Sequence, residues 1–489
     1  MDITEANFDP AISDRDKELK AARNSDQEIH LMDDLPEKEK KSKLFFAILE
    51  TCFIFIGLLC IYFFLPRMIH GDGAQRYQYL ADFLHHGITR NPGAKYSLVG
   101  PIFALPLLII GERLGQPVAW ILVYNYILFA GCLLAIYLLC RNHIDRGLLR
   151  KFILLLVTSS MFAAHLFAFY GEVFSAACIG VGIIAFMRRS RLSSIGGWIA
   201  VILGVVNTPA MVGGFCLLIF KRMLDMKRLR YLIAVVAVAA LILGESWLRR
   251  GSPQASGYAN DFGFHTVMPY SGLPGFSYPF FFGLISILFS FGKGLIFFTP
   301  GFLLPVRKTM LKLQEKYDLN LYQLYVLWLF FLVGLILVYS RWWAWYGGRY
   351  WGPRFFLFAS LPASLALAVR LHDKGTKLWV NIFTGVVLCL SAWVGVCAAL
   401  FQSDTYISTC SANNYALEAY CHYVPEFSVL WHPFVVHPHL DFNQGLYLVY
   451  LLVVFLYFFV PLLCKIYQQS KGIVVATCKP YLDMTKWRI

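Results

Sequence analysis

Long apolar runs separated by short polar segments dominate the chain. The first run, 44–65, is long enough to cross a bilayer core of about 30 Å as a helix. We interpret nine further runs as membrane spans, at 118–140, 152–169, 173–187, 231–247, 279–306, 321–340, 355–369, 377–401 and 445–463. The run 279–306 is interrupted by the glycine-rich segment FSFGKG (289–294). The pattern predicts an all-α, polytopic fold.

One apolar run, 194–220, is flanked by basic residues on both sides. Basic flanks mark the cytoplasmic side of a membrane, so a single crossing would violate the rule. Because Asn207-Thr208-Pro209 interrupts the middle of this run, we expect a hairpin of two short helices. Counting the hairpin as two, the pattern predicts about twelve transmembrane helices.

Composition and charge support the same class of protein. The chain has 489 residues, of which 58% are hydrophobic and 15% charged, which excludes an ordinary soluble protein. Its formal charge is +14, from 43 Lys and Arg against 29 Asp and Glu. In a membrane protein such an excess of Lys and Arg marks the cytoplasmic loops and favours contact with lipid headgroups. It does not indicate binding to nucleic acid.

The distribution of charge predicts the topology. Four lysines in 37–43 precede the first span and place the N-terminus in the cytoplasm. We expect a disordered cytoplasmic tail at 1–43 and a transmembrane core at 44–370 with a first extracytoplasmic loop at 66–117. C-terminal helices follow at 371–489, with an extracytoplasmic loop at 402–445 and a cytoplasmic tail at 465–489.

The first loop carries the densest group of ionisable residues. Asp72 lies between two glycines, with His70 before it and Arg76 one helical turn later. A helix over 72–86 would place Tyr77, Leu80, Ala81 and Leu84 on one apolar face, as in a helix lying on a membrane surface. The run 97–111 contains two prolines and is too short to span, so we expect it to be interfacial or partly re-entrant. We take Asp72 as a candidate catalytic base; a solvated juxtamembrane loop is the alternative.

Further ionisable residues are predicted on the same face of the membrane. Glu172 lies in a very short connection between two spans, where it is either a turn residue or a catalytic acid. Lys293 lies between two glycines inside an apolar run and needs an anion or a route to water. Glycines at a helix break expose backbone N–H groups, which suits a lipid-linked phosphate.

The segment RWWAWYGGRYWGPR (341–354) combines aromatic residues, glycines and arginines. Arginine binds phosphate through two hydrogen bonds, and aromatic faces stack on sugars and cations. We therefore expect Arg349 and Arg354 to bind phosphate, and expect the substrate to contact His70, Trp345, Tyr346, Trp351 and His265. The histidines have no spacing typical of a metal site, so neither a metal nor another cofactor is indicated.

Two cysteines share one polar loop. Cys410 and Cys421 lie in the predicted extracytoplasmic loop 402–445, where an oxidising compartment would permit a disulfide. The other cysteines are mostly single residues inside apolar runs, as is typical of small core residues.

The chain resembles polytopic glycosyltransferases of the GT-C superfamily. It shares with them an acid soon after the first span, a broken span with an SxGKGLxxxxP-like pattern, and a GGxxWGPR-like turn. The residues that match these two patterns are Ser290, Gly292, Lys293, Gly294, Leu295 and Pro300, and Gly347, Gly348, Trp351, Gly352, Pro353 and Arg354. The first loop departs from the family in having Gly-Asp-Gly in place of an acidic pair, which puts a metal requirement in doubt.

The resemblance implies a donor, a site and a location. Such enzymes take a sugar from a polyprenyl phosphate and pass it to a glycan, lipid or protein, and the bacterial members lie in the cytoplasmic membrane with interfacial helices in the first extracytoplasmic loop. By this resemblance Asp72 would activate the acceptor hydroxyl for an inverting single displacement. Lys293, Arg349, Arg354 and Arg76 would stabilise the leaving phosphate.

Other classes of protein fit part of the pattern. A multi-span transporter or lipid flippase would also have many spans and broken helices, although no internal repeat is evident and the polar residues gather at one face. A non-catalytic ligand-binding or assembly protein is a third interpretation. A membrane acyltransferase would need a catalytic histidine within a span, for which His165 is the candidate.

Overall fold

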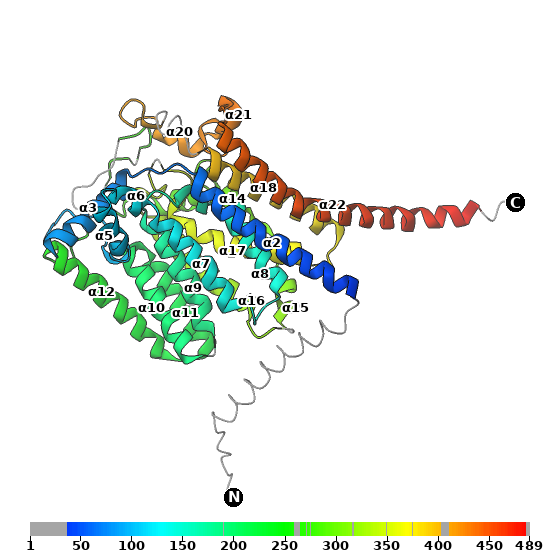
Figure 1. The fold of residues 1–489 in the computed structure, drawn as a ribbon, viewed down its shortest axis with the longest axis horizontal. Coiled ribbons are helices and arrows are strands. Elements are labelled where there is room, and N and C mark those ends of the chain that lie inside the picture. The colour runs from blue at the N-terminus through cyan, green and yellow to red at the C-terminus, as the bar shows by residue number, and fades with distance from the viewer. Residues whose placement is uncertain are drawn as a thin grey trace, which may run out of the picture.

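The described part of the chain is a bundle of helices. The computed structural model describes residues 37–485 apart from 189, 259–264, 270, 274, 315–316, 349, 374 and 402–409. Within these residues the regular elements are helices, without a strand, which confirms the predicted all-α class. The helices lie side by side, and the last of them projects from the bundle toward the C-terminus (Figure 1).

Seven of the described helices are long and apolar enough to cross a membrane. Three shorter apolar helices lie at Gly171–Met187, Arg191–Asn207 and Phe280–Phe289. The protein is an integral membrane protein, while the count of twelve spans stays a prediction. The predicted disorder of residues 1–36 lies outside the described residues.

The helices follow the predicted order. The first half contains α2 (Glu37–Phe64), α3 (Gly71–His86), α4 (Val99–Ile102), α5 (Leu105–Arg113), α6 (Pro117–Leu122), α7 (Tyr124–Cys140), α8 (Arg146–Thr158), η1 (Phe162–His165), α9 (Gly171–Met187), α10 (Arg191–Asn207), η2 (Pro209–Met211), α11 (Val212–Met226), η3 (Leu229–Tyr231) and α12 (Leu232–Arg250).

The second half contains α13 (Phe280–Phe289), α14 (Leu295–Phe298), η4 (Pro300–Leu303), α15 (Arg307–Gln314), α16 (Leu321–Tyr339), η5 (Arg354–Ala359), α17 (Ser360–His372), α18 (Leu378–Leu400), α20 (Glu418–Tyr423), η6 (Pro425–Phe427), α21 (His432–Val436) and α22 (Phe442–Thr485).

Two predicted boundaries were wrong. Residues 37–43 are not part of a disordered tail, because α2 begins at Glu37, whose carboxylate pairs with Lys41 one turn later at 2.7 Å. The predicted span 152–169 is a helix only as far as Thr158, and η1 follows. The hydroxyl of Thr158 donates to the Leu154 carbonyl, and that of Ser160 donates to the Leu156 carbonyl. These side chains compete with the backbone N–H groups for the same carbonyls, which favours the end of the helix here.

A buried ion pair joins three helices of the bundle. Arg150 of α8 donates to Glu50 of α2 at 2.6 Å, and the hydroxyl of Tyr457 of α22 donates to the same carboxylate at 2.7 Å. Glu50 is 2% exposed. A carboxylate inside a membrane protein needs such partners, so these contacts fix the packing of the first and last long helices.

The broken run 194–220 forms two helices, α10 and α11, that meet at Thr208 and the short η2. The side-chain amide of Asn207 donates to the Gly171 carbonyl at 2.9 Å, and its oxygen accepts from the Gly100 backbone N–H at 3.0 Å. Asn207 thereby fixes the start of α9 and the short α4 relative to the end of α10. Glu172 follows in the first turn of α9.

The first loop folds as short helices over a small apolar core. Leu80 of α3 packs with Leu108, Ile121 and Phe169, while Tyr77, Ala81 and Leu84 border this core, as the predicted amphipathic face requires. Two arginines of α12 hold the segment after α3. Arg249 donates to the Tyr96 carbonyl at 2.5 Å and Arg250 to the Ala94 carbonyl at 2.6 Å.

Candidate functional site

A buried arginine bridges two carboxylates from distant parts of the chain. Arg354, at the start of η5, lies 2.6 Å from a carboxylate oxygen of Asp72 and 3.5 Å from one of Glu172. The side chains of Arg354 and Glu172 are 5% and 9% exposed, whereas that of Asp72 keeps 20% of its surface accessible. The cluster is therefore buried around a carboxylate that can still be reached.

Helix starts position both acids. Asp72 lies in the first turn of α3 and Glu172 in the first turn of α9. The N-terminal end of a helix carries partial positive charge and favours carboxylates. Gly71 precedes Asp72 with φ +53°, and a Cβ there would collide with the Tyr350 hydroxyl at 1.8 Å. Its positive φ favours glycine at this position, and the absence of a side chain leaves room for the Tyr350 hydroxyl.

The surroundings of Asp72 keep it ionised. Burial raises the pKa of its carboxyl, but the Arg354 guanidinium, a hydrogen bond from the Tyr96 hydroxyl and the charge of Arg76 together lower that pKa below its ordinary value. The pKa of Tyr96 is raised, first by burial and then by Asp72, so its hydroxyl remains a donor. At neutral pH Asp72 is therefore an anion that is paired with Arg354.

Arg76 supplies a second cation beside this carboxylate. It is 6% exposed, and its guanidinium lies 4.8 Å from the centre of the Tyr96 ring. Its Nη1 donates to the Ser97 carbonyl at 3.5 Å, a long hydrogen bond, and its buried Nε has no partner among the described residues. A Cβ on Gly171 would lie 2.7 Å from the guanidinium carbon, so Arg76 also packs against the start of α9.

Aromatic residues enclose the cluster. The His70 Nε2 and the Tyr170 hydroxyl are 3.0 Å apart, and the His70 ring stacks on Tyr350 with ring centres 5.6 Å apart. The Asp72 backbone N–H donates to the Tyr350 hydroxyl at 3.3 Å. The Arg354 guanidinium lies over the Tyr350 ring, 4.1 Å from its centre. These contacts fix the direction in which Arg354 meets Asp72.

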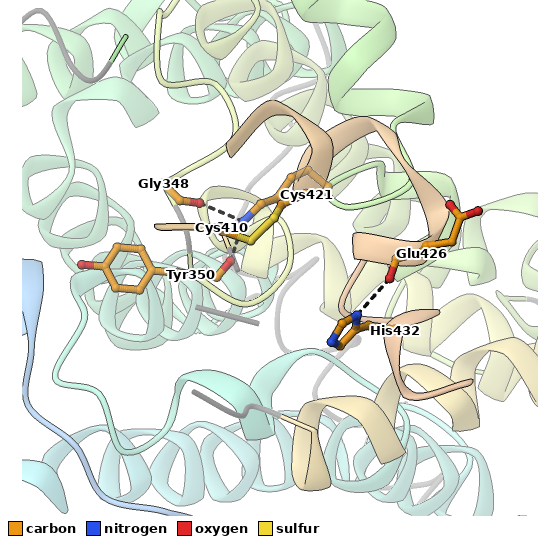
Figure 2. The surroundings of a disulfide bond; sticks show 7 residues. Gly348, Tyr350, Cys410, Cys421, Glu426 and His432 are labelled. Atoms are coloured by element: carbon orange, nitrogen blue, oxygen red, sulfur yellow. Dashed lines mark hydrogen bonds between the residues drawn. A yellow bond between two sulfur atoms is a disulfide. The ribbon is translucent and has the colours of Figure 1, made fainter. Parts of the chain in front are cut away.

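Lys293 organises the loop that carries Arg354. Its ammonium donates to the carbonyls of Gly348 at 2.9 Å and Gly352 at 3.0 Å, and also to the carbonyl of Tyr350 (Figure 2 shows the Gly348 and Tyr350 carbonyls beside the disulfide). An ammonium group has three N–H donors, and three carbonyls use them. The side chain is 1% exposed. This geometry favours a positioning role over the phosphate contact that the sequence predicts.

An aromatic pocket lies on the other side of the same loop. Its empty volume is about 400 Å³, and its lining consists of Thr266, Met268, Ser271, Gly272, Tyr278, Trp343, Trp345, Tyr346, Ala419, His422 and Tyr423. Two predicted substrate contacts, Trp345 and Tyr346, are thus in this pocket and not among the charged residues. His265 lies at its edge, where a Cβ on Gly272 would be 2.5 Å from the imidazole.

The remaining predicted residues are elsewhere. Trp351 is 7% exposed and packs edge-on against Phe298 of α14, with ring centres 5.4 Å apart. Its position beside the broken span makes it part of the packing beneath the loop. Arg349 lies outside the described residues. No three His, Cys, Asp or Glu side chains within the described part of the chain converge as a metal site.

The disulfide-bonded segment closes the pocket from one side. Cys410 and Cys421 are joined by a disulfide with their Cα atoms 6.1 Å apart (Figure 2). Cys421 belongs to α20, and the next residue, His422, accepts at its carbonyl a hydrogen bond of 2.9 Å from the Gly292 backbone N–H. The disulfide thus ties Cys410 to α20, and the backbone hydrogen bond holds α20 against the glycine turn that carries Lys293.

Several residues of the charged cluster and of the aromatic pocket were not predicted from the sequence. Tyr96, Tyr170 and Tyr350 contact the charged cluster, and Trp343 and His422 line the pocket. Tyr350 and Trp343 belong to the segment 341–354, and His422 follows Cys421. These three could have been suspected because they lie in or beside features that the sequence analysis singled out. Tyr170 stands two residues before Glu172 in the same short connection, which is a further signal from position, whereas the neighbours of Tyr96 in the sequence gave none.

Comparisons with known proteins add one loose structural likeness. No protein-family model matches the chain, and no curated protein sequence matches it. Among solved structures, the chain is similar to the crystal structure of ArnT from Cupriavidus metallidurans bound to undecaprenyl phosphate. The two are 13% identical, with 90% of this chain and 80% of that chain covered and a TM-score of 0.46. A superposition this loose assigns neither a family nor an activity.

Proposed function

We propose that the protein is a membrane glycosyltransferase that moves a monosaccharide from a polyprenyl-phosphate donor to an acceptor hydroxyl. The observation that carries this proposal is the bridge of Arg354 between Asp72 and Glu172, beside a second buried arginine, Arg76. A base and buried cations in one site are what a displacement with an anionic leaving group needs.

Asp72 acts as the base in this mechanism. Its carboxylate takes the proton of the acceptor hydroxyl while that oxygen forms a bond to the anomeric carbon. The bond between this carbon and the phosphate oxygen breaks, and polyprenyl phosphate leaves with the bonding electron pair. Direct attack inverts the anomeric centre. Base assistance of this kind contributes roughly 10²- to 10⁴-fold to the rate.

The arginines stabilise the leaving phosphate. The Nη1 of Arg354 is buried and makes no hydrogen bond among the described residues, although it lies 3.5 Å from Glu172. It can therefore donate to a phosphate oxygen without losing a bond. Arg76 offers its unpartnered Nε from the same helix as Asp72. Glu172 holds Arg354 in place, and Lys293 holds the loop, so neither needs to touch the donor.

The topology follows from the same proposal. Both termini lie in the cytoplasm and the site faces the opposite side of a bacterial cytoplasmic membrane, within a core of residues 44–370. The similar ArnT structure has undecaprenyl phosphate bound to it. Undecaprenyl phosphate is a polyprenyl phosphate, the same chemical class that we propose as the carrier here. The transferred sugar is a hexose or a pentose, and the acceptor is a glycan, a lipid or a protein.

Release of prenyl phosphate tests the proposal. Purified protein is offered a panel of short-chain prenyl-phosphate hexoses and pentoses with a lipid and glycan extract as acceptor, and the released prenyl phosphate is counted. We expect release by the wild type and by Asp82→Asn, a control on the same helix, and a loss of at least about a hundredfold in Asp72→Asn.

Two results would contradict the proposal. Absence of release across the whole panel would favour the transporter or flippase alternative. Equal release by the wild type and a folded Asp72→Asn protein would remove Asp72 as the base.

A further inference from the structure

The aromatic pocket has a neutral lining that the proposed chemistry does not use. None of the described residues that line it is Asp, Glu, Lys or Arg. The one titratable imidazole is that of His422, which is 3% exposed. Burial and then the charge of Lys293 lower the pKa of His422 well below its ordinary value, so the ring stays neutral. The lining therefore suits an uncharged ligand.

Three ring nitrogens of this lining lack partners. Both nitrogens of His422 and the indole nitrogen of Trp343 are buried and make no hydrogen bond among the described residues. Hydroxyl groups in the pocket are in contrast already used: the Ser271 hydroxyl lies 2.9 Å from the Met268 carbonyl, and that of Tyr423 lies 2.8 Å from the Ser286 hydroxyl. Buried polar groups are nearly always paired with protein, water or a ligand, so these nitrogens have bonding capacity left for a molecule in the pocket.

The shape of the lining indicates the class of ligand. The His422 ring stacks on Tyr346 with ring centres 4.2 Å apart, and Trp345 meets Tyr346 edge-on at 5.6 Å. A neutral imidazole offers one donor and one acceptor, and an indole offers one donor. Sugar rings combine C–H faces that pack on aromatic rings with hydroxyls that both donate and accept. The space within this lining is partly open to solvent, so a ligand can enter it from outside.

The pocket lies next to the charged cluster along one loop. Tyr346 lines the pocket, and the following residue, Gly347, accepts at its carbonyl a hydrogen bond of 2.6 Å from the Arg354 Nε. A molecule in the pocket is thus separated from Arg354 by the width of this loop. We propose that the pocket binds a saccharide unit of the acceptor on the far side of the loop from the hydroxyl that reacts at Asp72. This proposal rests on the proposed transferase function and gives the acceptor a chemical class.

Binding of free disaccharides tests this assignment without turnover. The probes are cellobiose, maltose and N,N′-diacetylchitobiose, followed by saturation-transfer NMR with the protein in a zwitterionic detergent that has no sugar headgroup. We expect saturable transfer to at least one probe. His422→Phe keeps the stacking on Tyr346 but removes both nitrogens, and should weaken binding about tenfold. Trp343→Phe, which removes one donor, should weaken it less.

The controls separate this proposal from the transferase itself. His439→Phe makes the same substitution at an exposed position outside the pocket and should bind like the wild type. Asp72→Asn should also bind like the wild type, so loss of the catalytic role would leave the binding result intact. Absence of saturable transfer to every probe, or equal affinity of the wild type, His422→Phe and Trp343→Phe, would overturn the assignment.

Discussion

The two sides of the loop 341–353 differ in their chemistry. On one side, Arg354 and Arg76 face Asp72 and Glu172, and the cluster is built from opposite charges. On the other side, the described lining of the pocket has no charged side chain, and its polar atoms belong to neutral groups. The displacement that we propose can use both environments: charge stabilises a leaving phosphate, and a neutral surface suits an uncharged acceptor.

One buried lysine connects the two sides. Lys293 binds three carbonyls of the loop, and its neighbour Gly292 binds the carbonyl of His422 in α20. A Cβ on Gly292 would collide with the Cys421 carbonyl at 1.9 Å, so glycine is needed for this close approach. The broken span is therefore the common support of the cluster and the pocket. A substitution in the charged cluster or in the pocket should affect that side alone. A substitution in the broken span should affect both the cluster and the pocket.

Replacing Arg354 should have the largest effect and should break only the charged side. Arg354→Gln leaves Asp72 and Glu172 without their shared cation and removes the donor to the phosphate. We expect kcat/KM for the donor to fall about a thousandfold, with disaccharide affinity retained. Arg341→Gln, at an exposed arginine whose guanidinium donates to the Phe276 carbonyl, is the control and should keep both. A parallel loss of disaccharide binding in Arg354→Gln would show that the two sides are one site.

Replacing Lys293 should weaken both sides. Lys293→Met keeps an unbranched side chain that is one atom shorter, but it leaves three carbonyls without their donor. We expect kcat/KM and disaccharide affinity each to fall about tenfold or more, and thermal unfolding in detergent to occur at a lower temperature. Lys308→Met, at an exposed position of α15, should change neither. A loss of turnover with unchanged stability and disaccharide binding would restore the direct phosphate contact predicted from the sequence.

Removing the disulfide should affect the pocket more than the charged cluster. The bond closes a short loop with a sequence separation of 11 residues and holds α20, which carries His422. In the double variant Cys410→Ser, Cys421→Ser we expect disaccharide affinity to fall roughly threefold and kcat/KM for the donor to change less. NMR titration and donor kinetics on the same preparation measure both. A greater loss in donor kinetics than in disaccharide affinity would reverse this order.

The effect of pH should be the smallest. The lowered pKa of Asp72 means that the folded carboxylate stays charged above its ordinary value of 3.8 and is protonated only below it. Burial and the charge of Lys293 also lower the pKa of His422 well below its ordinary value of 6.5, so its ring is neutral at that pH and above. We therefore expect neither kcat/KM nor disaccharide affinity to show an acid limb between about pH 5 and 8. An acid limb near pH 6 in kcat/KM would exclude Asp72 in this environment as the base.

The sequence predicted local features well because their causes are local. The helix α3 with its apolar face, the interrupted span at 289–294 and the break at Thr208 follow from periodicity, glycines and a proline. The sequence did not predict that α8 ends at Thr158, because the run is otherwise apolar and the hydroxyl groups of Thr158 and Ser160 bond to backbone carbonyls there. Helix α2 begins earlier than predicted because a charged segment can extend a helix that packing has already nucleated.

The site was predictable as a set of residues but not as an arrangement. Asp72, Glu172 and Arg354 stand out by residue type, yet their meeting depends on tertiary packing; the contact of Asp72 with Tyr350 spans 278 positions. Lys293 shows the same limit. Its setting between glycines in an apolar run revealed a buried cation, but only the fold shows that backbone carbonyls, not a phosphate, take up its three donors.

The configuration of the transferred sugar tests the central claim most directly. A donor of known anomeric configuration is converted by the wild-type protein, and the coupling constant of the anomeric proton in the first product is read by NMR. If Asp72 acts as a base for direct attack, the product has the inverted configuration and no sugar becomes attached to the protein. Retention of configuration, with a glycosylated Asp72 peptide in the mass spectrum, would contradict this role and make Asp72 a nucleophile.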